Sequence, residues 1–324
     1  MKSNFTFSKY SKTSIDRFLS IRDGETKIGQ TCQFDYSNND SKYVILGISE
    51  DIGPQSNLGF SGSDNAFKSF ISRFVNMQDN RFLRGNSVCI LGEIKSNDLF
   101  ESIETGRKLI SELDEFVKSI IEPIIQLGKI PIVIGGGHNN AFPLIWASSL
   151  AKNESINVIN LDPHADCRAL EGRHSGNPFS YAKHNQYLDH YSVLGLHQQY
   201  NNETMYEYLE ANNFNFTFFE DYLFNNRSLT QDIEHFAHVS FNKSIGVELD
   251  LDTIAFMPSS AFTPSGFTVN DARKYIHTIA KHKNISYLHL PEGAPSTLKE
   301  EKVVGKTLAY LVSDFIKQNT NFQK

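Results

Sequence analysis

Cysteine is scarce in this chain of 324 residues, which has only Cys32, Cys89 and Cys167, far apart and without C-x-x-C spacing. That scarcity excludes a disulfide framework and a cysteine-based zinc cluster, and it favours a reducing compartment. Long apolar runs are also missing, because no stretch approaches the roughly 20 residues that a membrane helix needs. The N-terminal MKSNFTFSKYSKTS lacks the apolar core of a signal peptide. We therefore expect a cytoplasmic protein without a membrane partner.

An excess of basic residues is the third absence. The chain has 31 Lys and Arg against 37 Asp and Glu, giving a net charge of −6, and the cations are scattered along the sequence. A nucleic-acid partner is therefore not expected. Hydrophobic residues at 40% and charged residues at 21% are close to globular averages, which argues against a disordered or fibrous protein.

Short apolar runs alternate with longer amphipathic segments from Lys42 onward. Residues 1–41 are polar and aromatic without a clear period, and we expect them to form a weakly ordered arm before a single domain at residues 42–324. The predicted strands are Tyr43–Ile48, Ser87–Leu91, Ile130–Gly135, Ile156–Leu161, Ser192–Leu196, Ser244–Leu251 and Ser286–Leu290. The predicted helices are Leu99–Leu127, Asn139–Lys152, Asn201–Asn212, Val269–Lys281 and Glu300–Lys317.

This alternation predicts right-handed β-α-β crossovers and a mostly parallel sheet that is covered on both faces. The fold class is therefore α/β, with three layers in the order α/β/α. In such sheets ligands bind at the carboxyl ends of the strands, so residues that directly follow the apolar runs are the candidates for a site.

The strongest local signal follows the apolar run Ile156–Leu161. Asp162, His164 and Asp166 have the spacing i, i+2, i+4, which turns all three side chains to one side of an extended backbone. Pro163 cannot donate to a sheet ladder, so the triplet should lie where the strand leaves the sheet. Two carboxylates beside an imidazole need a cation or strong pairing, although an isolated D-x-H-x-D can also be a solvated acidic loop.

A second acidic pattern begins in the run Ser244–Leu251, which otherwise resembles a central strand. Glu248, Asp250 and Asp252 occupy alternate positions, and burying three carboxylates without partners would cost several kcal/mol each. The alternative is an edge strand with one solvated face, but the apolar flank SIGV and the lack of a nearby Lys or Arg weigh against it. A bound metal ion accounts better for the pattern.

The third element is IPIVIGGGH, in which a buried-strand pattern ends in three glycines and His138. Glycines permit a sharp turn from a strand into a helix. A phosphate-binding loop is the competing interpretation, but neither a G-K-[ST] ending nor a G-x-G-x-x-G spacing is present. His138 is then either a metal ligand or an ordinary polar residue at a helix start.

Together the three elements supply two imidazoles and four carboxylates at strand ends. A carboxylate-rich set without thiolates favours harder divalent cations, Mn²⁺ foremost, with Fe²⁺, Co²⁺, Ni²⁺ and Zn²⁺ as alternatives. Two such ions about 3.5–4 Å apart could share a water molecule and lower its pKa toward neutrality. The predicted ligands are His138, Asp162, His164, Asp166, Asp250 and Asp252.

In these residues the chain resembles the ureohydrolase family of arginases, agmatinases and formimidoylglutamases. The family has a glycine-rich turn ending in His, a D-x-H-x-D block and a late D-x-D block in this order, and the resemblance spans about residues 43–295. It implies an arginase-like fold, two metal ions per chain and a homo-oligomer, commonly a trimer or hexamer. By resemblance, His138, Asp162, Asp166 and Asp250 would hold the first ion, and Asp162, His164, Asp250 and Asp252 the second.

The residues next to these motifs resemble those of formimidoylglutamases more than those of arginases. Arg168 stands where arginases have Asn, and Ser175 precedes Gly176 where arginases and agmatinases have His. Arg168 is thus a candidate clamp for a substrate carboxylate, with an exposed surface charge as the alternative. His174 is a candidate proton shuttle because its unperturbed pKa of about 6.5 suits that task. His174 lies one position before the place where the family has its His, so Ser175 or Asn177 is an alternative substrate contact.

The family also has an acidic residue after its last strand, and Glu292 in YLHLPEGAP matches that position. By resemblance it would hold a guanidinium or formamidinium group; a solvated loop glutamate is the alternative. The activity we expect first is hydrolysis of N-formimidoyl-L-glutamate to L-glutamate and formamide. The second candidate is hydrolysis of L-arginine to L-ornithine and urea, and the third is hydrolysis of agmatine or another guanidino compound. Two hypotheses of another kind are an inactive family member acting as a binding subunit and an unrelated single-metal phosphoesterase.

Overall fold

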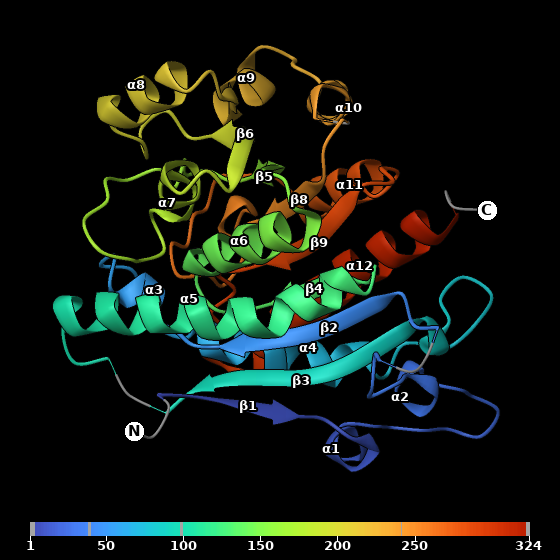
Figure 1. The fold of residues 1–324 in the computed structure, drawn as a ribbon. Coiled ribbons are helices and arrows are strands. Elements are labelled where there is room, and N and C mark those ends of the chain that lie inside the picture. The colour runs from blue at the N-terminus through green and yellow to red at the C-terminus, as the bar shows by residue number, and fades with distance from the viewer. Residues whose placement is uncertain (1–3, 38–39, 98–99, 241, 322–324) are drawn as a thin grey trace.

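The computed structural model describes residues 4–37, 40–97, 100–240 and 242–321 (Figure 1). Within these ranges a nine-stranded sheet has the order β1-β3-β2-β4-β9-β8-β5-β6-β7, and its neighbouring strands are parallel except for β1 and β3. The strands are β1 (Phe5–Lys9), β2 (Tyr43–Ser49), β3 (Val88–Ser96), β4 (Ile130–Ile134), β5 (Ile156–Leu161), β6 (Leu188–Leu196), β7 (Asn215–Phe218), β8 (Ile245–Leu249) and β9 (Ile285–Leu290).

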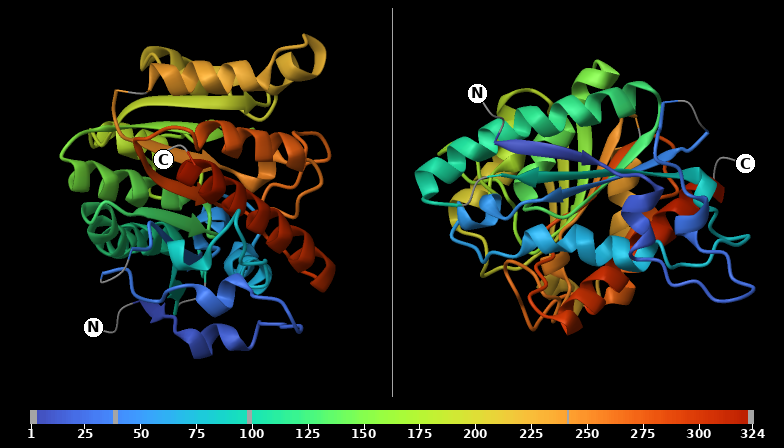
Figure 2. Two further views of the ribbon diagram at one scale, coloured as in Figure 1. Left: turned by 90° about the vertical axis from the view of Figure 1, so that its right-hand side faces the viewer. Right: turned by 90° about the horizontal axis from the view of Figure 1, so that it is seen from below.

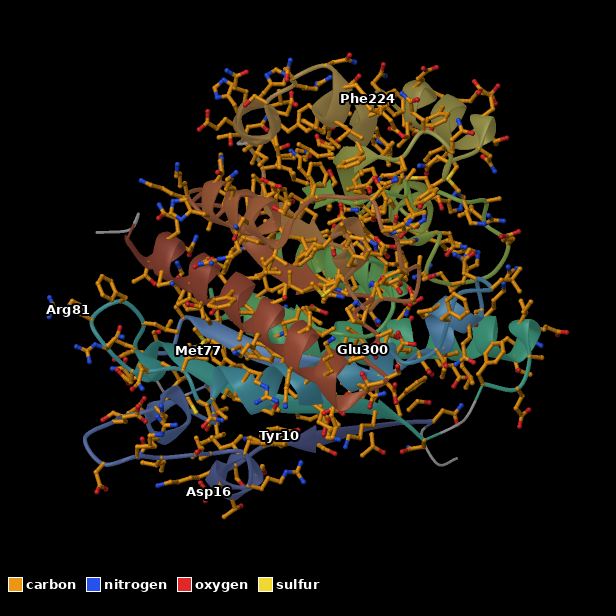
Figure 3. All side chains as sticks on the ribbon, turned by 180° about the vertical axis from the view of Figure 1, so that it is seen from behind. Tyr10, Asp16, Met77, Arg81, Phe224 and Glu300 are labelled. Carbon is orange, nitrogen blue, oxygen red and sulfur yellow. The ribbon has the colours of Figure 1, made fainter. Side chains whose placement is uncertain are left out.

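Helices cover both faces of the sheet, which confirms the predicted three-layer α/β/α class. One layer contains α5 (Ile103–Gln126), α6 (Ala141–Lys152), α7 (Pro178–His184) and α8 (Glu203–Ala211). The other contains α4 (Ala66–Phe74), α10 (Leu229–Val239), α11 (Val269–Ile279) and α12 (Leu298–Asn321). Figure 2 shows the sheet between these layers, and Figure 3 shows α12 crossing the second one. Short helices are α1 (Lys12–Asp16), α2 (Ile28–Thr31), α3 (Ile52–Gln55) and α9 (Phe219–Phe224).

Burial on both faces explains why the central strands are apolar at nearly every position. In β2, Tyr43 and Ile45 pack toward the layer of α4 and α12, whereas Val44 and Leu46 pack toward the layer of α5 and α6. The helix α5 buries one side only, consistent with its 3.6-residue apolar period. Ser102 caps its first turn by accepting a hydrogen bond from the amide of Thr105 at 3.2 Å.

The predicted strands all form, but two elements of the sheet do not follow from local pattern: β1 and β7. The helix predicted from Leu99 begins at Ile103, and Leu99 lies outside the described residues. The predictions also leave out α4, α7, α9 and α10. In α4, however, the alternation of buried and exposed positions is clear once the packing partner α12 is known.

The expectation of a weakly ordered N-terminal arm is wrong for its described part. The strand β1 pairs with β3, and the hydroxyl of Tyr10 donates a hydrogen bond to Glu93 at 3.0 Å. Ile15 and Ile28 are fully buried. The apolar residues of this segment lie on three short elements that pack against a distant part of the chain, so they show no common period. Residues 1–3 and 38–39 lie outside the description, and the division of the chain at residue 42 stays a prediction.

Four strands that are distant in sequence are neighbours in the centre of the sheet, in the order β4, β9, β8, β5. Because they are parallel, their carboxyl ends meet at one edge, where the direction of strand order changes. The segments that follow them contain every predicted metal ligand as well as Glu292. None of the helices within the described ranges combines the length and apolarity that crossing a bilayer requires.

Candidate metal centre

Three sequence elements converge on the imidazole of His138, which is fully buried behind β4. Its Nδ1 atom lies 3.1 Å from Asp162 Oδ2, 2.9 Å from Asp166 Oδ2 and 3.0 Å from Asp250 Oδ2. Neither ring nitrogen has a hydrogen-bond partner in the described structure. One nitrogen atom thus faces three carboxylate oxygens from two different strand ends.

A second group lies beside the first and shares Asp162 with it. His164 Nδ1 is 3.1 Å from Asp252 Oδ2 and 3.7 Å from Asp162 Oδ1. In each of the two groups the candidate ligand atoms lie within 4.8 Å of one another. The structure therefore brings all six predicted ligands together. Sharing of Asp250 between two ions stays a prediction.

The buried carboxylates of the cluster repel one another, which favours a bound cation. Burial, together with the neighbouring carboxylates, raises the pKa of Asp166, Asp250 and Asp252 above the ordinary aspartate value. Burial alone would lower the pKa of His138, but the surrounding carboxylates raise it well above the usual value. A single proton on Nδ1 cannot satisfy three oxygens, whereas divalent cations would neutralise the repulsion. The donor set fits a carboxylate and imidazole site for hard divalent ions.

The backbone at the acidic blocks corrects two details of the predictions. The strand β5 ends at Leu161, so Asp162 follows the sheet as expected, but Asp166 has a left-handed φ of +49° and the block is not extended. The strand β8 ends at Leu249, so Asp250 and Asp252 lie in a turn. Side chains of the D-x-D block therefore converge through turn geometry, because the amide of Asp252 donates to Asp250 Oδ1 at 2.9 Å.

The glycine-rich turn before His138 is organised by a carboxylate that sequence reasoning missed. Glu50, at the end of β2, is buried, and its Oε1 accepts hydrogen bonds from the Gly137 amide (2.8 Å), Asn140 Nδ2 (2.8 Å) and Asn139 Nδ2 (3.2 Å). Gly136 has a φ of +70°, and a Cβ there would lie 3.0 Å from the same oxygen. An acidic residue directly after an apolar strand was the available signal.

Glu292 lies at the same site and is not a solvated loop residue. It is 3% exposed, and its Oε1 accepts a hydrogen bond from the amide of His138 at 2.6 Å. Its Oε2 accepts a hydrogen bond from the hydroxyl of Ser260, in the loop after Asp252. Burial and the proximity of Asp250 raise the pKa of Glu292 to about 8. Its contact with substrate stays a prediction.

The loop after Asp166 is fixed by a buried arginine that the sequence did not single out. Arg173 is 3% exposed, and its Nε lies 2.8 Å from Asp114 Oδ2 on α5. Its Nη2 donates to the carbonyl oxygen of Asn139 at 2.8 Å, beside the His138 turn. Asn177 Oδ1 accepts from Nη1 of the same arginine at 2.5 Å. The loop and the glycine turn are therefore joined through one guanidinium.

The structure does not join His174 to the carboxylate cluster. The Nε2 atom of its fully buried ring lies 3.1 Å from Glu171 Oε1, and Nδ1 accepts from the amide of Gly176 at 3.1 Å. Burial and then the charge of Arg107 lower its pKa to about 4, so the ring is neutral at pH 7. Both nitrogens are engaged within the loop, and these contacts do not support the predicted proton shuttle.

The other predicted substrate contacts also have partners, either within the loop or, for Ser175, in Asn57 after α3. The amide of Asn177 donates to the carbonyl oxygen of Gly172 at 2.8 Å, and Ser175 Oγ accepts from Asn57 Nδ2 at 3.4 Å. Arg168 Nε lies 3.3 Å from Glu171 Oε1, and this half-exposed side chain lines a cavity of about 580 Å³ between α7, α8 and the loop. None of the six predicted metal ligands lines that cavity. Substrate roles for these three residues stay predictions.

Comparisons with known proteins agree with this geometry. A family model described as the arginase family matches residues 41–316, and the chain belongs to this family. The chain is 24% identical over 284 residues to a formimidoylglutamase of Staphylococcus epidermidis, covering 86% of this chain and 88% of that protein.

Among solved structures, formimidoylglutamase of Bacillus subtilis has a TM-score of 0.77 at 15% identity, covering 94% of this chain and 95% of that one. A Trypanosoma cruzi formiminoglutamase with Mn²⁺ has a TM-score of 0.72 at 17% identity, covering 90% of this chain and 98% of that one. These similarities establish the arginase-like fold.

Proposed function

We propose that this protein is a formimidoylglutamase that hydrolyses N-formimidoyl-L-glutamate to L-glutamate and formamide with two divalent cations, Mn²⁺ foremost. The observation that supports this most directly is the buried Nδ1 of His138, which has no hydrogen-bond partner among three carboxylate oxygens. Similar proteins are named formimidoylglutamases, and one similar structure is described with Mn²⁺. When bound, the cations would acidify a water molecule and so supply a nucleophile at neutral pH.

The protein's own residues would then bind and orient the substrate. Ser260 and the amide of His138 hold the Glu292 carboxylate beside the cluster. An amidinium group is planar and cationic, and an opposite charge close to a buried carboxylate favours its ionised form. Glu292 would thus be neutral without substrate, and ionised and paired with the amidinium group when the substrate is bound. Its almost complete burial keeps competing water away from this contact.

L-Arginine remains the second candidate substrate because of the position of Arg168. That side chain pairs with Glu171 and lines a cavity apart from the cluster, so a clamp for the glutamate carboxylates is not preassembled. A substrate without an extra carboxylate would not need it. Arg168→Ala should raise the KM for formimidoylglutamate more than it lowers kcat if the clamp forms on binding.

Product analysis tests the proposal. The Mn²⁺-loaded protein is incubated with formimidoylglutamate and with L-arginine in parallel, and glutamate with formamide is assayed against ornithine with urea. Asp162→Ala serves as the inactive control. Glutamate with formamide supports the proposal, and ornithine with urea replaces it with arginase activity. No turnover of these two substrates, and none of agmatine, combined with about two metal ions per chain would favour a binding subunit of the family.

The cellular context belongs to the same proposal. A formimidoylglutamase acts in histidine degradation and an arginase in arginine metabolism, so the products also identify the process. The free thiols of Cys32, Cys89 and Cys167 support a cytoplasmic location. Assembly as a homotrimer or hexamer rests on the family resemblance, and size-exclusion chromatography with light scattering tests it.

A further inference from the structure

A buried polar network lies on the side of His138 that faces away from the carboxylate cluster. Glu248 in β8 and His289 in β9 are opposite each other in the sheet register, and both are fully buried. Glu248 Oε2 lies 2.7 Å from His289 Nδ1 and 3.5 Å from His138 Nε2. Its other oxygen, Oε1, accepts a hydrogen bond from the hydroxyl of Tyr287 at 2.7 Å. Among the residues that the structure describes, this network contacts the metal centre through His138.

These contacts explain why Glu248 is not itself a ligand of the main cluster. Each of its oxygens already has a short contact, one with Tyr287 and one with His289. The separation of 2.7 Å between Glu248 and His289 leaves no space for a cation between those two atoms. A buried carboxylate is costly unless donors surround it, and here two neighbouring side chains of β9 provide them. Among the three alternating acidic residues, Asp250 and Asp252 thus belong to the carboxylate cluster, whereas Glu248 belongs to the buried network.

A histidine that binds a metal through Nδ1 must carry its proton on Nε2. In a site without water that proton needs an acceptor, and Glu248 is the carboxylate that faces Nε2 of His138. A hydrogen bond from Nε2–H to such an acceptor would fix the tautomer and ring orientation and make the ligating nitrogen more basic. Phe179 holds the same ring from another side, in edge contact at 5.4 Å between ring centroids.

We infer that Glu248 and His289 are positioning residues, which hold the proton of His138 on Nε2 and so direct the Nδ1 lone pair at the carboxylate cluster. His289 donates Nδ1–H to Glu248 and fixes the carboxylate, and Tyr287 supports it from the other oxygen. This inference rests on the metal centre of the proposed function, but it does not depend on the substrate. Sequence pattern could not show it, because His289 lies 41 positions from Glu248 and the two meet only through strand pairing.

Metal affinity provides the first test. Glu248→Gln keeps the size of the side chain but removes the charge, and we expect Mn²⁺ to bind roughly 10–100-fold more weakly, measured by competition with a chelator. His289→Gln should weaken binding by less, and Tyr287→Phe by the least, because that hydroxyl contacts the oxygen that does not face His138. Urea unfolding of each metal-free variant shows whether the fold is retained.

The second test reads this proton in the protein loaded with Zn²⁺, which is diamagnetic. Histidine ¹H–¹⁵N NMR of the wild type should show His138 protonated at Nε2 with a downfield Nε2–H signal, and Glu248→Gln should move this signal upfield. A merely structural role would leave the spectrum unchanged. Restoration of the Nε2–H signal and of at least part of the affinity by Glu248→Asp would support the role of charge.

Three results would overturn the inference. These are a folded Glu248→Gln protein with wild-type Mn²⁺ affinity, an unchanged Nε2–H signal of His138 in that variant, or a third Mn²⁺ per chain that disappears in His289→Gln. The last would make the His138, Glu248 and His289 group a cation site. If the wild type bound Mn²⁺ but hydrolysed neither substrate, only the proposed function would fail.

Discussion

Removing the metal should lower the thermal stability of this protein. The size of the effect should differ between variants that lack different carboxylates of the metal centre. A cation that binds only the folded state stabilises it by RT ln(1 + [L]/Kd), which is about 2.7 kcal/mol at 100 times Kd. Unfolding entropy is about 2.1 cal/mol/K per residue, or about 0.7 kcal/mol/K for 324 residues. One ion should therefore raise Tm by about 4 °C, and two ions by about 8 °C.

Two single substitutions divide this shift. Asp162 belongs to both ligand groups, so Asp162→Asn should abolish nearly all of the Mn²⁺-induced rise in Tm. Asp252 belongs only to the second group, so Asp252→Asn should keep about half of it, or about 4 °C. Asp23→Asn, at an exposed position, is the matched control and should keep the full shift. Differential scanning calorimetry with and without Mn²⁺ measures all three.

Without metal, the Asp252→Asn variant should be more stable than the wild type. Burial and the neighbouring carboxylates raise the pKa of Asp252, so its ionisation opposes folding and the metal-free wild type should lose stability as pH rises above about 4. Asp252→Asn removes this contribution and should raise the metal-free Tm at pH 8. The reasoning would be refuted if Asp162→Asn kept more than half of the Mn²⁺ shift, or if Asp252→Asn lowered the metal-free Tm at pH 8.

The remaining predictions concern groups around the site and in the core. Arg173→Met leaves Asp114 buried without its partner, so we expect a loss of about 3–5 kcal/mol in urea unfolding. Burial raises the pKa of Asp114 to about 6 even beside Arg173, so this loss should be smaller at pH 5 than at pH 8. Glu50→Gln places an amide among hydrogen-bond donors and should cost about 1–3 kcal/mol and weaken Mn²⁺ binding. Burial lowers the pKa of Lys42 to about 8, so wild-type stability should rise relative to Lys42→Met between pH 8 and about 10.4.

Each of these predictions has a control and a contrary outcome. Arg84→Met removes a partner of Asp79 at an exposed position and should cost at most about 1 kcal/mol. An equal loss of unfolding free energy in both arginine variants would show that the buried Asp114 pair contributes no more than an exposed pair. Unchanged Mn²⁺ affinity in Glu50→Gln would separate the glycine turn from metal binding. A stability difference between wild type and Lys42→Met that stayed constant from pH 8 to about 10.4 would contradict the lowered lysine pKa.

Local sequence was enough to single out the six candidate ligands, which the structure brings together, and the central strands. Metal-binding chemistry restricts residue type, and short spacings such as D-x-H-x-D keep the ligands together whatever the rest of the chain does. Strands buried on both faces must be apolar along their length, so the strands at Tyr43–Ile48 and Ile156–Leu161 could be predicted without a structure. Each of the three blocks directly follows an apolar run, and this predicted that they would meet at the carboxyl ends of the strands in a parallel sheet.

Long-range packing decided which groups support those ligands, and local sequence does not record it. Glu50, Arg173 and His289 act across 87, 34 and 41 positions of the chain, and no local period shows contacts of that range. The strand β1 pairs with β3 at the edge of the sheet, and its five residues do not show locally where in the sheet they will pair. His174 had a suitable residue type, but loop packing commits both its ring nitrogens. Ligand identity depends on local chemistry, whereas the position and charge of those ligands depend on contacts that form only in the folded chain.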